Sequence, residues 1–206
     1  MASFIIHIAV AQELNKRLKR NNQKILIGSI APDIAKFIGQ TKVETHFQKT
    51  IDDLPNLDKF LSKYKEYLVD DFVLGYYIHL YTDYLWFKEI EPSIYHNSVL
   101  YKLDNTTEVI SNKDRLVYFY HDYDLLNKKL IELYDIKLDF LSKDIPELKN
   151  IIKEYSYDKT SVIIKKASDI IAKDNVGEFY VFDEKIVSDF ISRAIDIIYD
   201  ELERIL

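Results

Sequence analysis

The stretch from Val73 to Phe87, VLGYYIHLYTDYLWF, is the most informative segment of this 206-residue chain. Its side chains are apolar or aromatic except at Gly75, His79, Thr82 and Asp83. The four-residue spacing places the histidine and the aspartate on one face of an α-helix, one turn apart. Burying such a pair among apolar groups is costly unless a partner satisfies both side chains. The stretch therefore predicts a central helix that carries a site.

The pair His79 and Asp83 has the chemistry of a metal site. An imidazole nitrogen and a carboxylate oxygen one helical turn apart can meet the same ion. The chain has no cysteine, so any metal must take imidazole and carboxylate ligands, which favours zinc, manganese or iron. The alternative is a buried ion pair that only fixes the packing of the helix.

Helical periodicity continues through almost the whole chain. Apolar residues recur at steps of three and four, and four glycines and four prolines interrupt them little. This pattern predicts an all-α, single-domain multi-helix bundle over residues 1–206, a length that suits one core. The expected helices are Ser3–Arg20, a short helix from Lys24 leading to Pro32, Leu57–Leu68, Asp70–Lys88, Arg115–Tyr134, Ile145–Tyr155, Asp158–Lys173 and Asp183–Leu206. We expect a polar loop at Lys102–Lys113, and EFYVF (178–182) could only be an isolated strand without a partner.

Charge and the N-terminal sequence restrict the partners and the location. The net charge is −6, and no basic run extends beyond KRLKR (16–20), so a nucleic-acid footprint is weak. The N-terminal MASFIIHIAVAQEL has no basic region, and His7 interrupts its apolar run, so we expect a cytoplasmic protein. The longest apolar stretch is too short to span a bilayer and contains Asp83, so no transmembrane segment is expected. The oligomeric state is not predicted.

Three further polar residues stand in apolar or aromatic surroundings upstream of the central helix. They are His7 in FIIHIAV, Asp33 in IGSIAPDI and His46 in ETHF. Together with HLYTD they form the order His, Asp, His, His-x-x-x-Asp. This order resembles the zinc-dependent phospholipase C family over roughly Phe4 to Phe87. The all-helical phospholipase C/P1 nuclease-like architecture that the resemblance implies agrees with the periodicity.

The resemblance implies a ligand set and a reaction class. Asp33, His46, His79 and Asp83 would surround one metal, and Asp83 would bridge to a second metal that His7 also touches. Asp33 would orient or deprotonate the attacking water. The implied protein is a zinc-dependent hydrolase with a di- or trinuclear site, acting on a phospholipid or on another phosphodiester or phosphomonoester.

The chain departs from the family pattern at the third metal. Family members complete that site with a His-x-x-x-Glu pair, whereas the residues four beyond His96 and His121 are Leu100 and Leu125. Two zinc ions are therefore expected, and a third stays open. The lipid-binding C-terminal module of the toxin members is also missing, so the resemblance supports a phosphoester more strongly than a phospholipid.

His121 and Asp122, in YFYHDYDLL, form a further candidate pair. Either residue could complete the shell of the second metal, or both could belong to a Tyr/His/Asp hydrogen-bond network. The same dyad, with Asp169 or Asp196 downstream, would suit an HD-type metal-dependent phosphohydrolase, which is the rival enzyme hypothesis.

Each upstream residue also has a purely structural interpretation. Asp33 after Pro32 could begin a helix, His46 could bind a backbone carbonyl in a loop, and His7 could be a satisfied core histidine. His96 is expected in a surface loop. A sealed centre without an open coordination position would indicate a non-catalytic, metal-stabilised binding module.

Overall fold

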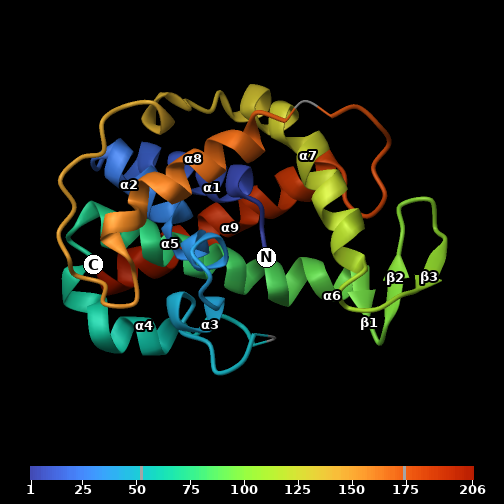
Figure 1. Ribbon diagram of the computed structural model, residues 1–206, viewed down its shortest axis with the longest axis horizontal. Helices are drawn as coiled ribbons and strands as arrows, with labels where there is room; N and C mark the ends of the chain where they lie inside the picture. Colours follow the sequence, from blue (N-terminus) through green and yellow to red (C-terminus); the bar gives the residue numbers. More distant parts are fainter. Residues whose placement is uncertain (52, 174) are drawn as a thin grey trace.

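The computed structural model describes residues 1–51, 53–173 and 175–206 and is mostly helical. Figure 1 shows the helices gathered around α5, with a small sheet projecting at one end. The α-helices are α1 (Phe4–Leu18), α2 (Asn22–Ile30), α3 (Lys42–Thr45), α4 (Leu57–Tyr64), α5 (Asp71–Leu85), α6 (Glu91–Ile94), α7 (Arg115–Tyr134), α8 (Thr160–Ile171) and α9 (Glu184–Ile205). Short 3₁₀ segments join several of them, among them η1 (Ala31–Phe37). The all-α prediction is confirmed.

The central helix forms where the sequence predicts it. Asp70 caps α5 by accepting hydrogen bonds from the backbone N–H groups of Phe72 and Val73. Nearly every side chain of α5 is buried, as expected for a helix that is apolar on all sides. The regular α-helix ends at Leu85, and a π-helical turn at Trp86–Ile90 leads into α6, so the predicted single helix to Lys88 is irregular at its end.

Two glycines allow α2 and α5 to pack backbone to backbone. A Cβ atom on Gly28 would lie 2.3 Å from the carbonyl oxygen of Phe72, and one on Gly75 would lie 2.2 Å from that of Ile25. No side chain fits at either position, so glycine is required there by the close approach of the helices. This approach brings the end of α2 beside the polar residues of α5.

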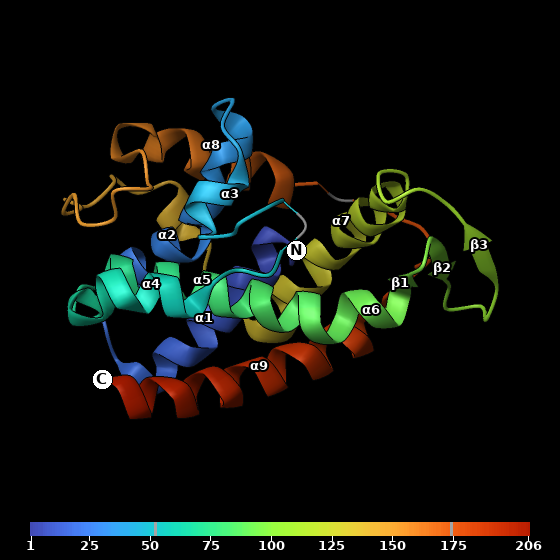
Figure 2. The same ribbon diagram turned by 90° about the horizontal axis from the view of Figure 1, so that it is seen from below.

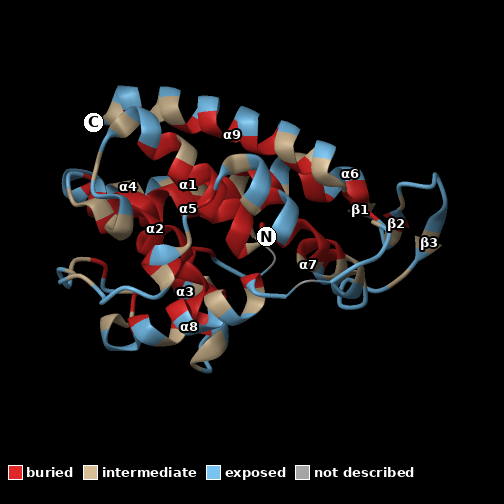
Figure 3. Ribbon diagram, turned by 90° about the horizontal axis from the view of Figure 1, so that it is seen from above, coloured by how far each residue is buried: buried red, intermediate tan, exposed pale blue. Residues whose placement is uncertain are grey.

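The remaining helices enclose this pair. Figure 2 shows α9 along one side of α1 and α5, with α8 and α3 on the opposite side. In Figure 3 the faces that these helices turn inward are buried and the outer face of α9 is exposed. The buried apolar side chains form one cluster that draws on α1, α2, α5, α7, α8 and α9. Among the described residues, no helix combines the length and apolar character needed to cross a membrane.

Several segments differ from the expected secondary structure. The predicted polar loop Lys102–Lys113 contains β3 (Thr107–Val109), which pairs antiparallel with β2 (Val99–Tyr101), and β2 pairs with β1 (Tyr95–His96). The predicted helix Ile145–Tyr155 is irregular instead. The hydroxyl of Tyr157 accepts from the N–H groups of Ile151 and Ile152, so side chains replace helical backbone partners there.

The segment EFYVF (178–182) is not a strand. Its backbone N–H groups at Tyr180, Val181 and Phe182 donate to the carboxylate of Asp122 at distances of 2.7–3.1 Å. The Asp122 side chain thus accepts the hydrogen bonds that the backbone N–H groups of this segment would otherwise donate to a neighbouring strand.

Candidate metal centre

Five of the predicted ligands meet in the interior of the bundle. His7 comes from α1, Asp33 from η1, His46 from the end of α3, and His79 and Asp83 from α5. The three histidines and Asp83 have no exposed surface, and Asp33 is 2% exposed. Four segments that are distant in the sequence therefore converge on one buried polar cluster.

The two oxygens of Asp83 face different histidines. Oδ1 lies 3.4 Å from Nε2 of His7. Oδ2 lies 3.4 Å from Nε2 of His46 and 3.6 Å from Nε2 of His79. The backbone N–H of Ala2 donates to Oδ1 at 2.9 Å. One carboxylate therefore lies between the two halves of the cluster.

Hydrogen bonds orient the imidazoles of His46 and His79. Nδ1 of His79 lies 2.7 Å from the carbonyl oxygen of Ser29, and since a carbonyl only accepts, this nitrogen carries the proton. The hydroxyl of Thr45 donates to the carbonyl of Lys42 and lies 3.1 Å from Nδ1 of His46, which makes that nitrogen the donor. In both neutral rings, Nε2 then carries no proton, and its lone pair is directed at the centre.

These lone pairs converge without a proton between them. Nε2 of His46 and Nε2 of His79 are 3.2 Å apart, and Oδ2 of Asp83 lies next to both. Ligands of a tetrahedral zinc ion lie about 3.3 Å from one another, given Zn–N distances of about 2.0 Å. The observed spacing fits a zinc ion bound by these three atoms, and Oδ1 of Asp33, 3.8 Å from Nε2 of His46, lies beside them.

Buried polar atoms without partners support the same conclusion. Both ring nitrogens of His7 and Oδ2 of Asp83 are buried and make no hydrogen bond. Such atoms are costly in a protein interior, and a metal ion would satisfy the lone pairs of Asp83 Oδ2 and of one His7 nitrogen. Two overlapping groups of possible ligands occur among the described residues, namely His7, His79 and Asp83, and Asp33, His46 and His79.

The electrostatic environment favours the protonation states that metal ligands need. Burial by itself raises the pKa of Asp33, but the ammonium groups of Lys36 and Lys42 bring it well below its usual value. Burial also opposes ionisation of Asp83, yet the imidazoles of His7 and His46 lower its pKa well below the usual value. Burial lowers the pKa of His46 and His79. Ionised carboxylates and neutral imidazoles result at neutral pH.

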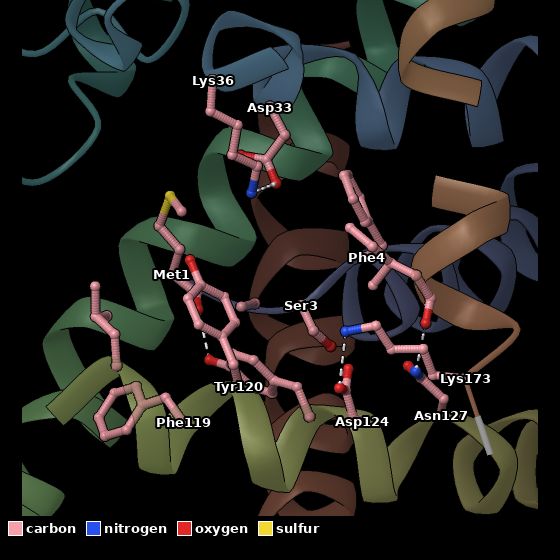
Figure 4. A pocket seen from close by; sticks show the side chains of 14 residues that line it. Met1, Ser3, Phe4, Asp33, Lys36, Phe119, Tyr120, Asp124, Asn127 and Lys173 are labelled. Carbon is pink, nitrogen blue, oxygen red and sulfur yellow. Dashed lines mark hydrogen bonds and ion pairs between the residues drawn. The ribbon is translucent and has the colours of Figure 1, made fainter. Parts of the chain in front are cut away.

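A cavity of about 120 Å³ adjoins the centre on the side of Asp33. Figure 4 shows Asp33 and Lys36 at one wall of this cavity, with Met1 and Tyr120 beside them and Asp124 beyond. The lining is mainly apolar, from residues such as Phe4, Phe119 and Tyr123. Of the five converging residues, Asp33 is the one that borders this space.

The structure does not bring His121 or Asp122 to the centre. Asp122 is buried and uses its carboxylate on the backbone of Tyr180, Val181 and Phe182. His121 lies beside it, with Nδ1 3.0 Å from Oδ1 of Asp122, and its ring packs against Tyr180. The dyad therefore has the geometry of the hydrogen-bond network that was its alternative interpretation.

The downstream partners of the rival HD-type hypothesis also lie elsewhere. Asp169 pairs with Lys165 and Asp196 pairs with Arg17, both on exposed helix faces. His96 lies on β1, where its ring stacks on Tyr101 at the surface.

Four contributors to the site were missed in the sequence. Lys36 and Lys42 pair with Asp33, the Ser29 carbonyl orients His79, and the Ala2 N–H binds Asp83. Only Lys36 had a local signal, because it follows Asp33 by three residues. The other three depend on long-range packing.

Comparison with known proteins supports the resemblance that the motifs suggest. The sequence profile of the family described as zinc dependent phospholipase C matches residues 3–180. The chain therefore belongs to this family. Searches of curated proteins and of solved structures found no significant match.

Proposed function

We propose that this member of the zinc-dependent phospholipase C family is a hydrolase that cleaves a phosphoester at a centre of two zinc ions. The observation that carries the proposal is the carboxylate of Asp83, whose Oδ1 faces His7 and whose Oδ2 faces His46 and His79, within two overlapping groups of possible ligands. This arrangement suits two neighbouring ions with a carboxylate between them.

The donor set matches zinc chemistry. His46, His79, Asp33 and Asp83 would hold one ion, and Asp83 and His7 would hold the second. When bound, zinc would supply Lewis-acid activation of a water molecule and neutralise charge on phosphoryl oxygens. The Ser29 carbonyl keeps Nε2 of His79 free of a proton, and the Ala2 N–H fixes the Asp83 carboxylate.

Asp33 is proposed as the residue that orients and deprotonates the attacking water. It is an ionised carboxylate at the edge of the centre, and it borders the adjacent cavity. A water molecule entering from that cavity would meet Asp33 before any other member of the cluster. The carboxylate could accept a hydrogen bond from this water, orient it and take its proton.

The adjacent cavity supports a catalytic role over a purely structural one. A structural zinc site is closed by four protein ligands, whereas a catalytic site keeps a position for water or substrate. Here one side of the centre faces a space lined by aromatic side chains and by Lys36. This observation favours turnover over the non-catalytic binding module.

The test combines metal content with hydrolysis of generic phosphate esters. Zinc titration of metal-free wild-type protein should load two equivalents, and Asp83→Asn should lose one or both together with turnover, because its charge and both oxygens serve the two ions. His96→Ala is the matched control, since His96 is exposed and its ring stacks on Tyr101 rather than on a member of the cluster.

Two results would count against the proposal. A wild-type protein that stays empty after zinc titration at neutral pH would exclude a zinc hydrolase. Equal zinc content and equal rates in Asp83→Asn and His96→Ala would exclude the assigned centre.

A further inference from the structure

The carboxylate of Asp33 is shared by two lysines. Nζ of Lys42 contacts Oδ1 of Asp33, and Nζ of Lys36 lies 3.3 Å from Oδ2. In η1 the side chain of Lys36 stacks above that of Asp33, because residues three apart overlap in a 3₁₀-helix. Lys42 arrives from α3 on the other side. Both ammonium groups therefore lie directly beside the centre.

The position of two lysines beside a metal centre calls for an explanation. Lys42 is buried, with its side chain 11% exposed, and lysine is almost never buried without a partner, whereas the side chain of Lys36 is 30% exposed. A cation placed next to a metal centre is repelled by the metal. The Asp33 carboxylate would then be shared between the metal and both ammonium groups, so a further anion would stabilise the loaded arrangement.

The net charge of the cluster indicates which kind of anion would bind beside the lysines. The two carboxylates of the cluster, Asp33 and Asp83, are balanced by the ammonium groups of Lys36 and Lys42. A loaded centre would then carry the full charge of its metal ions. In addition, when an oxygen of Asp33 binds a metal, its hydrogen bonds to the two lysines become weaker. The ammonium groups then need another acceptor. A dianionic phosphate supplies more charge and more acceptor oxygens than the singly charged group of a phosphodiester.

The two lysines also face the spaces from which a ligand would enter. Lys36 lines the cavity beside Asp33, and Lys42 lines a neighbouring cavity of about 630 Å³. Met1, Leu116 and Tyr120 line both cavities. Among the other cations that line these cavities, Arg115 pairs with Glu91 and Lys173 pairs with Asp124, while the exposed Lys113 lines only the larger cavity. Lys36 and Lys42 are the pair that shares the carboxylate of a metal ligand.

We propose that Lys36 and Lys42 form a phosphate-recognition element, and that it selects a phosphate monoester over a phosphodiester as the substrate of this centre. The inference rests on the proposed function and narrows its substrate class. The terminal phosphate of the monoester would accept hydrogen bonds from both ammonium groups while its remaining oxygens face the metals.

The experiment measures binding rather than turnover. Zinc-loaded protein is titrated calorimetrically with inorganic phosphate, as the dianion probe, and with dimethyl phosphate, as the diester probe. The compared proteins are wild type, Lys36→Gln, Lys42→Gln, the double variant and Lys63→Gln. Lys63 is the matched control because it also pairs with a carboxylate, that of Glu154, outside both cavities.

Wild type should bind phosphate more tightly than dimethyl phosphate. Each single glutamine variant should weaken phosphate binding about tenfold or more, with a much smaller effect on dimethyl phosphate, because each removes one charge-assisted hydrogen bond. Lys63→Gln should behave as wild type. Lys36→Arg and Lys42→Arg keep the charge and should retain most of the affinity, which provides a test if Lys42→Gln does not fold.

The outcomes separate the two levels of the proposal. If wild type takes up no zinc, the proposed function fails and the phosphate element fails with it. If zinc binds but the double variant keeps wild-type affinity for phosphate, or wild type binds both probes equally, only the lysine inference is overturned. Increased zinc uptake in the double variant without loss of phosphate affinity would identify the lysines as mere counter-ions of Asp33.

Discussion

At the scale of single residues, orientation by neighbours makes the candidate centre specific. Many proteins contain histidines and aspartates, but here Ser29 and Thr45 determine which nitrogen of each ring carries the proton. Such outer hydrogen bonds fix the ring position and the tautomer of metal-binding histidines. The lone pairs of His46 and His79 are directed at each other for this reason.

Asp122 provides a residue-scale test of the rival HD-type hypothesis. Asp122→Asn should lower the free energy of unfolding by about 1.5–3 kcal/mol, because a neutral amide replaces the charged acceptor of three backbone N–H groups. Its zinc content should equal that of wild type. Denaturant unfolding and metal analysis of the same samples measure both quantities. Loss of zinc with unchanged stability would favour the HD-type site instead.

The buried histidines predict how the stability of the metal-free protein depends on pH. Burial lowers the pKa of His46 and His79 below the ordinary value of 6.5. As the pH falls below 6.5, the unfolded chain takes up protons on these residues and the folded protein does not. The free energy of unfolding therefore decreases by as much as about 1.4 kcal/mol per pH unit for each histidine.

Thermal melts of metal-free protein between pH 7 and pH 5.5 check this dependence. The melting temperature of wild type should fall by several degrees over the range, on the order of 2–4 °C per kcal/mol. His79→Asn should flatten the dependence, whereas His96→Ala, at an exposed position, should leave it unchanged. A wild-type melting temperature that is constant or rises toward pH 5.5 would contradict neutral buried histidines.

At the scale of elements, the approach of α2 to α5 places the Ser29 carbonyl against His79. Glycine at positions 28 and 75 permits the approach, and the carbonyl of Ile25 occupies the place of a Cβ on residue 75. The helix pair and the orientation of the histidine are therefore coupled. A larger residue at either glycine would move the two helices apart.

Gly75→Ala tests this coupling. The variant should lose about 1–3 kcal/mol of stability or more through overpacking, and it should bind zinc more weakly because Ser29 moves away from His79. Gly177→Ala is the control, since its added Cβ would lie 3.5 Å from His121 in ordinary contact. Chemical denaturation and zinc titration of both variants give the comparison. Wild-type zinc affinity in a destabilised Gly75→Ala protein would show that the packing and the site are independent.

At the scale of the whole molecule, four separated segments are joined at the centre. The ligands belong to α1, η1, α3 and α5, so the centre forms only when these elements are packed together. A metal that binds the folded state alone stabilises the entire fold by mass action. Metal content and global stability should therefore change together.

Removing the metal should lower the melting temperature of the whole protein. With zinc at about 100 times its dissociation constant, the loss is about 2.7 kcal/mol, or roughly 5–10 °C for a chain of this size. Circular dichroism melts with and without a strong chelator measure the shift. Asp83→Asn, which lacks an intact centre, should show little response to the chelator. An unchanged midpoint in wild type verified to be metal-free would refute the stabilising role.

Local spacing along the chain determined the central helix and the most specific part of the site. The apolar run of α5 is helical because its period and length leave few alternatives, and helix geometry alone puts His79 and Asp83 on one face. The ordered motifs containing His7, Asp33 and His46 were sufficient to suggest the family. These features depend on neighbouring residues, which a sequence displays directly.

Tertiary structure alone decided the secondary structure of weakly periodic segments. The strands at 95–109 are too short to show alternation and exist through their pairing. The predicted helix at Ile145–Tyr155 gives way to contacts with Tyr157, and the segment 178–182 binds Asp122 instead of a strand. In each case a distant or side-chain partner satisfies the backbone and outweighs a weak local preference.

Tertiary structure also decided the composition of the site beyond its predicted ligands. His121 and Asp122 have the same residue types as the converging ligands. In the folded chain, however, Asp122 binds the backbone of the loop at Tyr180, and His121 lies beside Asp122. Lys42, nine residues from Asp33, enters the cluster. Which charged groups meet in the interior depends on how whole helices pack, because burial and long-range contacts select among pairs that the sequence alone presents as equivalent.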